Sequence, residues 1–373
     1  MKLPGIKIVS IIPYRIFPAQ LGGEKGIALF TEYLAKRINI TAITTQNNDP
    51  EYAKGYTLLN ILSNSRLRYV NLFLFFRLKK ILVREKATHL LIEHPYYGWL
   101  AWLLTSYINI KFIVHSHNIE YMRSRSIGRW WWKGLKKYEG WVYRKADKVF
   151  FISEDDRQVA ISSLNADPAG SLEITYGIEL SEVPDDMENC RRLISIKHGI
   201  NPGVKILLFN GALYHHTNYN ALNIILEKVN PYLLQQAHFD YKILVCGKGL
   251  PDFFNSLKEY EDRNVIFAGF VNDISLYFKA ADIFLNPILS GGGVKTKAIE
   301  ALAMNCTVVS TELGALGIRK EVCGDKLQIV KKYDWQKFSE LVIESSKSDT
   351  KIPETFFKYY YWGNIIEKVI SVL

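Results

Sequence analysis

A glycine-rich loop followed by lysines is the segment best suited to bind an anion. Residues 290–293 read SGGG and follow an apolar, strand-like run, and a helix is predicted to start near Val294. Three glycines leave backbone N–H groups unshielded, and the positive end of the helix dipole points to the same place. Lys295 and Lys297 add full positive charge there, so this junction has the composition of a diphosphate site.

Glu300 lies one turn further into the same predicted helix. A carboxylate can accept hydrogen bonds from two neighbouring hydroxyls, as in the diol of a ribose. The alternative is a glycine-rich turn followed by a solvated lysine face. Glycines, lysines and a glutamate coincide at one strand-to-helix junction, and this favours the nucleotide site.

Three histidines follow the ends of two successive strand-like runs. His94 comes after 89–93, and His115 and His117 end or follow 111–115. The carboxyl ends of parallel strands share one edge of a sheet, where ligands bind. The three histidines are therefore candidates for contact with a ligand at that edge. A single histidine at a strand end is otherwise often structural.

The elements around these residues alternate between strand and helix. Strand-like runs lie at 6–12, 40–45, 89–93, 111–115, 148–153, 205–210, 241–246, 264–268, 282–286 and 307–310. Helix-like segments lie between them at 24–37, 66–84, 132–145, 218–235, 251–260, 274–279 and 296–304. This alternation predicts an α/β chain with two doubly wound, Rossmann-like parallel sheets facing a central cleft.

The predicted domains are 1–180 and 181–360. Residues 165–203 are polar and rich in proline, and we interpret them as the connection plus one irregular element.

The composition is that of an ordinary folded protein with an excess of basic residues. The 373 residues are 48% hydrophobic and 23% charged, and 47 Lys and Arg against 37 Asp and Glu give a net charge of +10. These values exclude a largely disordered chain, and the charge favours anionic partners. The four cysteines form no short pair, and no apolar run spans a bilayer, so a cytoplasmic location is expected.

Residues 264–318 resemble the retaining glycosyltransferases of family 4, which have the GT-B fold. The matching residues are Gly269-Phe270-Val271, Asp273-Ile274, Ala281-Asp282, Pro287, the glycines 291–293, Lys297, Glu300-Ala301 and Val308-Val309. By this resemblance Glu300 holds the ribose hydroxyls of the donor, and Gly22 and Gly23 lie against its phosphate. The resemblance also implies that His117, with His115 as the alternative, is the catalytic histidine near the anomeric centre of the donor sugar, and we expect His94 to face the acceptor. It further implies that a terminal helix within 361–373 packs back on the first domain, which holds the acceptor, while the second domain binds the donor.

Two positions depart from the family pattern. The first glutamate of the Glu-x7-Glu motif is replaced by Gly292, and an Arg and a Lys that many relatives place after the first strand of the second domain are missing from 214–218. The diphosphate must then be held mainly by Lys295, Lys297 and the helix end. The full predicted donor site comprises Gly22, Gly23, Gly211, Gly247, Val271, Gly292, Gly293, Val294, Lys295 and Thr296, with His117, Lys297 and Glu300 as catalytic residues.

The resemblance implies a retaining, metal-independent transferase that moves a hexose-type sugar from a UDP- or GDP-sugar. The acceptor is expected to be a saccharide or a lipid-linked glycan used in cell-envelope polysaccharide synthesis, and no cofactor is implied. Two alternatives stay open: a nucleotide-sugar epimerase of the same fold, and a non-catalytic nucleotide-sugar-binding protein. No nucleic-acid motif is present.

Two segments of the first half are both basic and apolar. Residues 66–84 read RLRYVNLFLFFRLKKILVR, and Trp130, Trp131 and Trp132 stand beside Arg129 and Lys133. Basic residues beside aromatic ones suit the surface of an anionic membrane. For 66–84 a core helix is an equal alternative, whereas the tryptophans favour a membrane or lipid-acceptor contact. We therefore expect peripheral attachment to the inner face of the cytoplasmic membrane.

Overall fold

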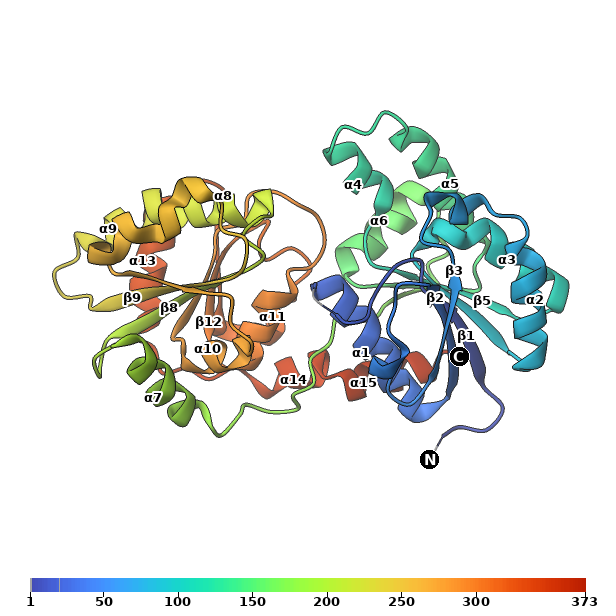
Figure 1. Ribbon diagram of the computed structural model, residues 1–373, viewed down its shortest axis with the longest axis horizontal. Coiled ribbons are helices and arrows are strands. Elements are labelled where there is room, and N and C mark those ends of the chain that lie inside the picture. The colour runs from blue at the N-terminus through green and yellow to red at the C-terminus, as the bar shows by residue number, and fades with distance from the viewer. Residues whose placement is uncertain (1, 20) are drawn as a thin grey trace. The chain divides into compact units, whose positions relative to one another are not determined.

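The computed structural model describes residues 2–19 and 21–373, which fold into two compact units (Figure 1). The first unit comprises Met1–Glu179 and Trp362–Leu373, and the second comprises Leu180–Tyr361. The C-terminal segment therefore belongs to the unit that the N-terminus begins. Each unit is built on its own parallel sheet.

The sheet of the first unit has seven parallel strands in the order β3-β2-β1-β4-β5-β6-β7. Their bounds are β1 (Lys7–Ile11), β2 (Asn39–Thr45), β3 (Thr57–Leu62), β4 (His89–Glu93), β5 (Lys111–Ser116), β6 (Lys148–Phe151) and β7 (Ser171–Glu173). The order reverses between β1 and β4, which are neighbours. A reversal of this kind opens a crevice at the carboxyl ends of the two strands, where open α/β sheets bind ligands.

Helices cover both faces of this sheet. They are α1 (Gly22–Arg37), α2 (Leu74–Arg84), α3 (Gly98–Ile108), α4 (Glu120–Ser126), α5 (Trp132–Lys145), α6 (Glu154–Leu164) and α15 (Trp362–Ile370), with 3-10 turns η1 (Pro50–Tyr52), η2 (Arg66–Val70) and η3 (Pro95–Tyr97). Because side chains alternate along a strand, Val9 packs with α2 and α3, whereas Ile8 packs with α1 and α15. The strands are thus apolar throughout, as expected for a sheet buried on both faces.

The second sheet repeats this plan with six parallel strands in the order β10-β9-β8-β11-β12-β13. Their bounds are β8 (Lys205–Asn210), β9 (Tyr241–Cys246), β10 (Val265–Gly269), β11 (Ile283–Asn286), β12 (Thr307–Thr311) and β13 (Leu327–Val330). Here the order reverses between β8 and β11. The second crevice is therefore expected at the carboxyl ends of these two strands.

Helices also lie on both faces of the second sheet (Figure 1). They are α7 (Met187–His198), α8 (His216–Ile224), α9 (Asn230–Leu234), α10 (Ile274–Ala280), α11 (Thr296–Ala303), α12 (Lys320–Cys323), α13 (Trp335–Ser346) and α14 (Glu354–Tyr360), with the π-helical element η4 (Ile225–Val229) and the 3-10 elements η5 (Asp252–Arg263) and η6 (Gly324–Lys326). The prediction of two doubly wound parallel sheets is confirmed.

Local differences from the sequence prediction have physical reasons. The predicted helix 66–84 is broken, because the backbone N–H of Phe73 donates to Oδ1 of Asn71 at 3.0 Å and forms a side-chain turn between η2 and α2. The predicted irregular region 165–203 contains the regular helix α7, which ends at Gly199 with φ of 64°. The sequence did not indicate the strands β3, β7 and β13, which are short or lie at sheet edges.

Candidate functional site

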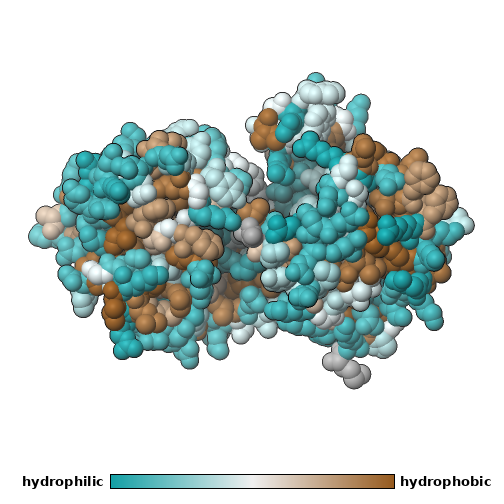
Figure 2. Space-filling model, in the orientation of Figure 1, coloured by the Kyte–Doolittle hydropathy of each residue, from teal (hydrophilic) through white to brown (hydrophobic). Residues whose placement is uncertain are grey.

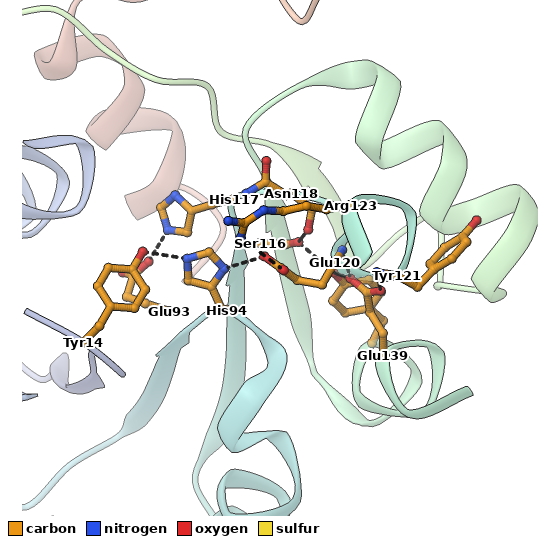
Figure 3. Close-up of polar contacts among 11 residues, drawn as sticks. Tyr14, Glu93, His94, Ser116, His117, Asn118, Glu120, Tyr121, Arg123 and Glu139 are labelled. Carbon is orange, nitrogen blue, oxygen red and sulfur yellow. Dashed lines mark hydrogen bonds and ion pairs between the residues drawn. The ribbon is translucent and has the colours of Figure 1, made fainter. Parts of the chain in front are cut away.

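A hydrogen bond spans the point where the strand order of the first sheet reverses. Tyr14 follows β1 and His94 follows β4, and the Tyr14 hydroxyl lies 2.7 Å from Nε2 of His94 (Figure 3). His94 is buried and has a left-handed backbone, with φ of 66°, immediately before Pro95. A non-glycine residue in this region is strained, and such residues gather at functional sites.

The other nitrogen of His94 lies beside a carboxylate. Nδ1 of His94 is 3.1 Å from Oε1 of Glu120, which is also buried. Burial would raise the pKa of Glu120, but the hydrogen bond from His94 and its charge outweigh it and lower that pKa. One tautomer satisfies both contacts: Nδ1–H donates to Glu120, and Nε2 accepts from the Tyr14 hydroxyl.

A second carboxylate holds His117. Nε2 of His117 is 2.6 Å from Oε2 of Glu93, the last residue of β4, and Nδ1 of His115 is 2.9 Å from the same oxygen. Burial would raise the pKa of Glu93, but the two histidines lower it, while burial and the charge of His115 lower the pKa of His117. A neutral His117 beside an ionised Glu93 donates through Nε2–H and keeps Nδ1 as an acceptor.

Glu139 fixes the start of the helix that carries Glu120. Its two carboxylate oxygens accept hydrogen bonds from the backbone N–H groups of Glu120 at 2.8 Å and of Tyr121 at 3.0 Å. These are the first two residues of α4. Burial raises the pKa of Glu139 to about 7. Because these N–H groups have no partner within the helix, Glu139 anchors the turn that presents Glu120 to His94 (Figure 3).

One group among the described residues could offer ligands to a metal ion. Ligand atoms of Glu93, His115 and His117 all lie within 4.8 Å of one another. However, the 2.6 Å between Nε2 of His117 and Oε2 of Glu93 is a hydrogen-bond distance. It leaves no room for an ion between these atoms, so the arrangement fits a hydrogen-bonded carboxylate and imidazole cluster.

In the second unit a lysine spans the corresponding reversal of strand order. Lys297 lies in the first turn of α11, which follows β11, and its Nζ donates to the backbone oxygen of Asn210 at 3.0 Å, at the end of β8. It also donates to Oδ1 of Asn218 at 3.1 Å. Burial first, and then the charge of Lys295, lowers the pKa of Lys297 to about 7.

The loop before α11 is organised around Lys295. The Nζ of Lys295 donates to the backbone oxygens of Gly292 at 3.0 Å and of Gly293 at 2.9 Å. Burial lowers the pKa of Lys295 to about 8. Two lysines with lowered pKa values therefore stand at one helix start. Each would hold its proton more tightly beside a bound anion.

Glycines keep side chains away from this edge. A Cβ on Gly247, which has φ of 154°, would lie 2.0 Å from the backbone oxygen of Gly211. The backbone N–H of Gly211 donates to the backbone oxygen of Cys246 at 3.1 Å, and that of Gly247 donates to the oxygen of Gly269 at 2.8 Å. Glycine is therefore required at these two strand ends by the packing of the chain itself, since a side chain at Gly211 would also meet that of Asn218.

The remaining predicted residues occupy several environments. Gly22 and Gly23 are the first residues of α1 and not a loop before it, and Glu24 accepts the N–H of Leu21 at 3.1 Å. Val271 follows β10 and is half-buried, as is Glu300 within α11. Gly292, Gly293, Val294 and Thr296 lie in the loop and first turn before Lys297.

The tryptophans divide between solvent and core. Trp130 is 89% exposed and Trp131 is 43% exposed, whereas Trp132 packs against the apolar core of the first unit. Sequence reasoning did not single out Tyr14, Glu93 or Glu120 as functional. Glu93-His94 and the run from His117 to Glu120 were visible signals, since both place a carboxylate beside a histidine at a strand end.

Two family models match the chain. Residues 22–180 match the model described as Glycosyltransferase Family 4, and residues 204–347 match that described as Glycosyl transferases group 1. An uncharacterized 44.6 kDa protein from the cps region of Klebsiella pneumoniae is 28% identical, over 95% of this chain and 94% of its own length.

Solved structures share the fold over nearly the whole chain. A glycosyltransferase of Rickettsia africae has a TM-score of 0.73 at 17% identity, with 99% of this chain and 98% of that chain covered. Anabaena Alr3699/HepE, solved in complex with UDP, has a TM-score of 0.73 at 12% identity, with 98% and 99% covered. The lipopolysaccharide outer core galactosyltransferase WaaB has a TM-score of 0.68 at 13% identity, with 99% and 100% covered.

Proposed function

We propose that this chain, which belongs to the group 1 and family 4 glycosyltransferases, transfers a hexose-type sugar from a nucleotide-diphosphate donor with retention of configuration. The observation that carries this proposal is Lys297 at the reversal of strand order, beside the glycine loop. The complex of HepE with UDP supports a uridine nucleotide as the donor carrier.

The second unit is proposed to stabilise the leaving group. As the bond between sugar and phosphate breaks, negative charge grows on the departing diphosphate. Lys295, Lys297 and the backbone of the glycine loop would neutralise that charge. Glu300 is proposed to hold the ribose, with Gly211, Gly247 and Val271 near the base or phosphates. Gly292, in place of the family's glutamate, would contact the donor through its backbone.

The first unit is proposed to position the sugar. Nδ1 of His117 would accept a hydrogen bond from a sugar hydroxyl, while Nε2–H of the same ring donates to Glu93. Oε1 of Glu93 is buried without a hydrogen-bond partner among the described residues, so the cluster has polar capacity that a ligand could use. His94 is proposed to face the acceptor, and Gly22 and Gly23 the donor phosphate. We propose no metal in this reaction, because the lysines supply the positive charge.

The acceptor is proposed to be a saccharide or lipid-linked glycan of a cell-envelope polysaccharide. The relative from the cps region supports this class. A membrane-embedded acceptor would explain peripheral attachment to the inner face of the cytoplasmic membrane, with Trp130, Trp131 and Trp132 near the acceptor side.

Donor screening tests the proposal. UDP-, GDP- and ADP-sugars are added to the purified protein, and unfolding temperature and release of nucleoside diphosphate are measured. The true donor should stabilise the protein in proportion to RT ln(1 + [L]/Kd) and be consumed when an acceptor extract is present. Stabilisation by none of the three, or conversion to an epimeric nucleotide sugar without transfer, would contradict it.

A further inference from the structure

An exposed apolar surface lies on the first unit, along η2, the following turn and α2. We name it the α2 face, and it consists of the large apolar side chains of η2, the following turn and α2 that point to solvent. They are Leu67, Val70, Leu72, Phe73, Phe76 and Val83. Phe73 is 81% exposed and Phe76 is 70% exposed. Figure 2 shows apolar side chains gathered on the side of this unit where α2 and α3 lie.

These side chains are additional to those that α2 needs for its own packing. Leu74, Leu78, Ile81 and Leu82 fill the core side of the helix and are buried. A helix on a sheet needs one apolar stripe, and α2 has it. Phe76 has an edge contact with Phe75, 5.5 Å between ring centroids, but stays mostly exposed. Clusters of exposed phenylalanines of this kind mark interaction sites.

The charge of the α2 face itself is positive. Arg66, Arg77 and Lys80 are exposed on η2 and α2. Arg84, at the end of α2, is also exposed and pairs with Glu85, the residue that follows the helix. Residues 52–84 contain no Asp or Glu. A protein partner that covered this surface would have to be both apolar and acidic along its length. A bilayer with anionic headgroups offers that combination uniformly, since basic side chains pair with headgroups and phenylalanines enter the acyl boundary.

The surface continues onto α3. Leu103 and Tyr107 are also exposed, and the Tyr107 ring lies 6.0 Å from that of Phe75. Nζ of Lys79 lies 4.0 Å from the centroid of the Tyr107 ring. Tyrosine beside lysine is typical of the headgroup level of a membrane interface. Within the described residues, no helix has both the length and the apolar character needed to cross a bilayer.

We infer that the α2 face docks this protein on an anionic membrane, with α2 in the plane of the interface and Phe73 and Phe76 inserted. Trp130 and Trp131 form a smaller exposed aromatic site on the same unit. The α2 face is thus the surface that would carry the proposed membrane attachment. Its physical basis is a set of exposed phenylalanines among arginines and lysines, and it does not depend on the donor.

Vesicle flotation tests the inference on the full chain. Wild-type protein is mixed with vesicles of neutral phosphatidylcholine, with or without about 30% phosphatidylglycerol to supply the anionic surface, and the bound fraction is measured at low and high salt. We expect binding to the anionic vesicles, weakened by salt. F73S/F76S should lower the partition coefficient about 100-fold or more, and R77S/K80S about 10- to 30-fold.

A matched control replaces exposed apolar side chains of the second unit. F253S/I196S removes two residues that are 73% and 74% exposed, and it should bind vesicles as the wild type does. Equal vesicle binding by F73S/F76S and wild type would overturn the inference. So would a wild-type dimer without lipid that F73S/F76S converts to a monomer. Donor turnover is measured for each variant in parallel, so loss of turnover and loss of docking are seen separately.

Discussion

The two units share one topology but place different chemistry at the same point. Each sheet reverses its strand order once, and in each a side chain forms a hydrogen bond across the reversal. In the first unit this bond joins Tyr14 to His94, within a network of buried carboxylates and imidazoles. In the second it joins Lys297 to a backbone oxygen, beside bare glycines.

The two units differ in how their buried charged groups are stabilised. In the first unit Glu93, Glu120 and their histidines compensate one another, so ionised carboxylates persist although they are buried. In the second unit burial is the main cause that lowers the pKa values of Lys295 and Lys297. The first arrangement satisfies its ionised carboxylates with hydrogen bonds from imidazole N–H groups, whereas the second has positive charge that an anion would stabilise. A shared fold therefore does not fix the chemistry of its crevice.

Removing the cation of the second unit should have the largest effect. Lys297→Met is expected to lower transfer about 10²- to 10³-fold, because one donor to the developing charge is lost. The variant should stay folded, since burial disfavours the lysine charge in the absence of ligand. Initial rates and unfolding temperature are measured, with the exposed Lys228→Met as control. Near wild-type turnover in Lys297→Met would contradict the proposed role.

Changing the first unit should affect turnover rather than nucleotide affinity. His117→Ala removes a hydrogen bond worth about 1–3 kcal/mol, which corresponds to about 10- to 100-fold in rate. Glu93→Gln should have a smaller effect of the same kind. Calorimetric titration with nucleoside diphosphate should give the wild-type Kd for both variants. A large loss of that affinity would show that the two units do not divide the work as proposed.

Nucleotide affinity should depend on pH through the second unit. An anion binds best to protonated lysines, and Lys297 and Lys295 have pKa values of about 7 and about 8. Raising the pH through these values removes their protons, so affinity should fall at least about tenfold between about pH 7 and about pH 9. Binding should take up protons from the buffer, and Lys297→Met should flatten the profile. A nucleotide affinity that does not change with pH in the wild type would show that these lysines do not bind the nucleotide.

Disrupting the bond across the first reversal should affect stability modestly. Tyr14→Phe removes the hydroxyl that donates to His94, and the free energy of unfolding should fall by about 0.5–1.5 kcal/mol. The matched control is Tyr52→Phe, which removes the hydroxyl of an exposed tyrosine and should leave stability unchanged. Denaturant unfolding measures both variants. An unchanged stability for Tyr14→Phe would show that this contact does not hold the first network together.

A chelator should have the smallest effect. We expect transfer to be unchanged by EDTA, since Glu93 and His117 are hydrogen-bonded to each other. Metal analysis of the purified protein is the matched measurement. A stoichiometric metal that Glu93→Gln abolishes, together with loss of transfer on chelation, would assign the cluster a metal and contradict this expectation.

The sequence predicted the buried parts of the fold better than its edges. β4, β8 and β9 have the predicted bounds, because continuous apolar runs mark strands covered on both faces. The edge strands β3 and β13 have mixed side chains and give no such signal. The break at Asn71 depends on one side-chain hydrogen bond, which periodicity does not reveal.

The candidate site was predictable where local spacing sets it. Glycines, lysines and Glu300 lie within one loop and helix, so their proximity follows from the sequence. Tyr14, after β1, meets His94, after β4, and Glu93 at the end of β4 meets His117, after β5. Only the order of the strands in the sheet brings these pairs together. Contacts between distant segments of this kind need the assembled sheet.

Diffraction from crystals soaked in a nucleoside diphosphate tests the central claim most directly. We predict density for the two phosphates beside the glycines at 291–293, within hydrogen-bonding reach of Lys297, and its loss in crystals of Lys297→Met. Ordered diphosphate bound at another edge of either sheet, or equal occupancy in the variant, would contradict the account.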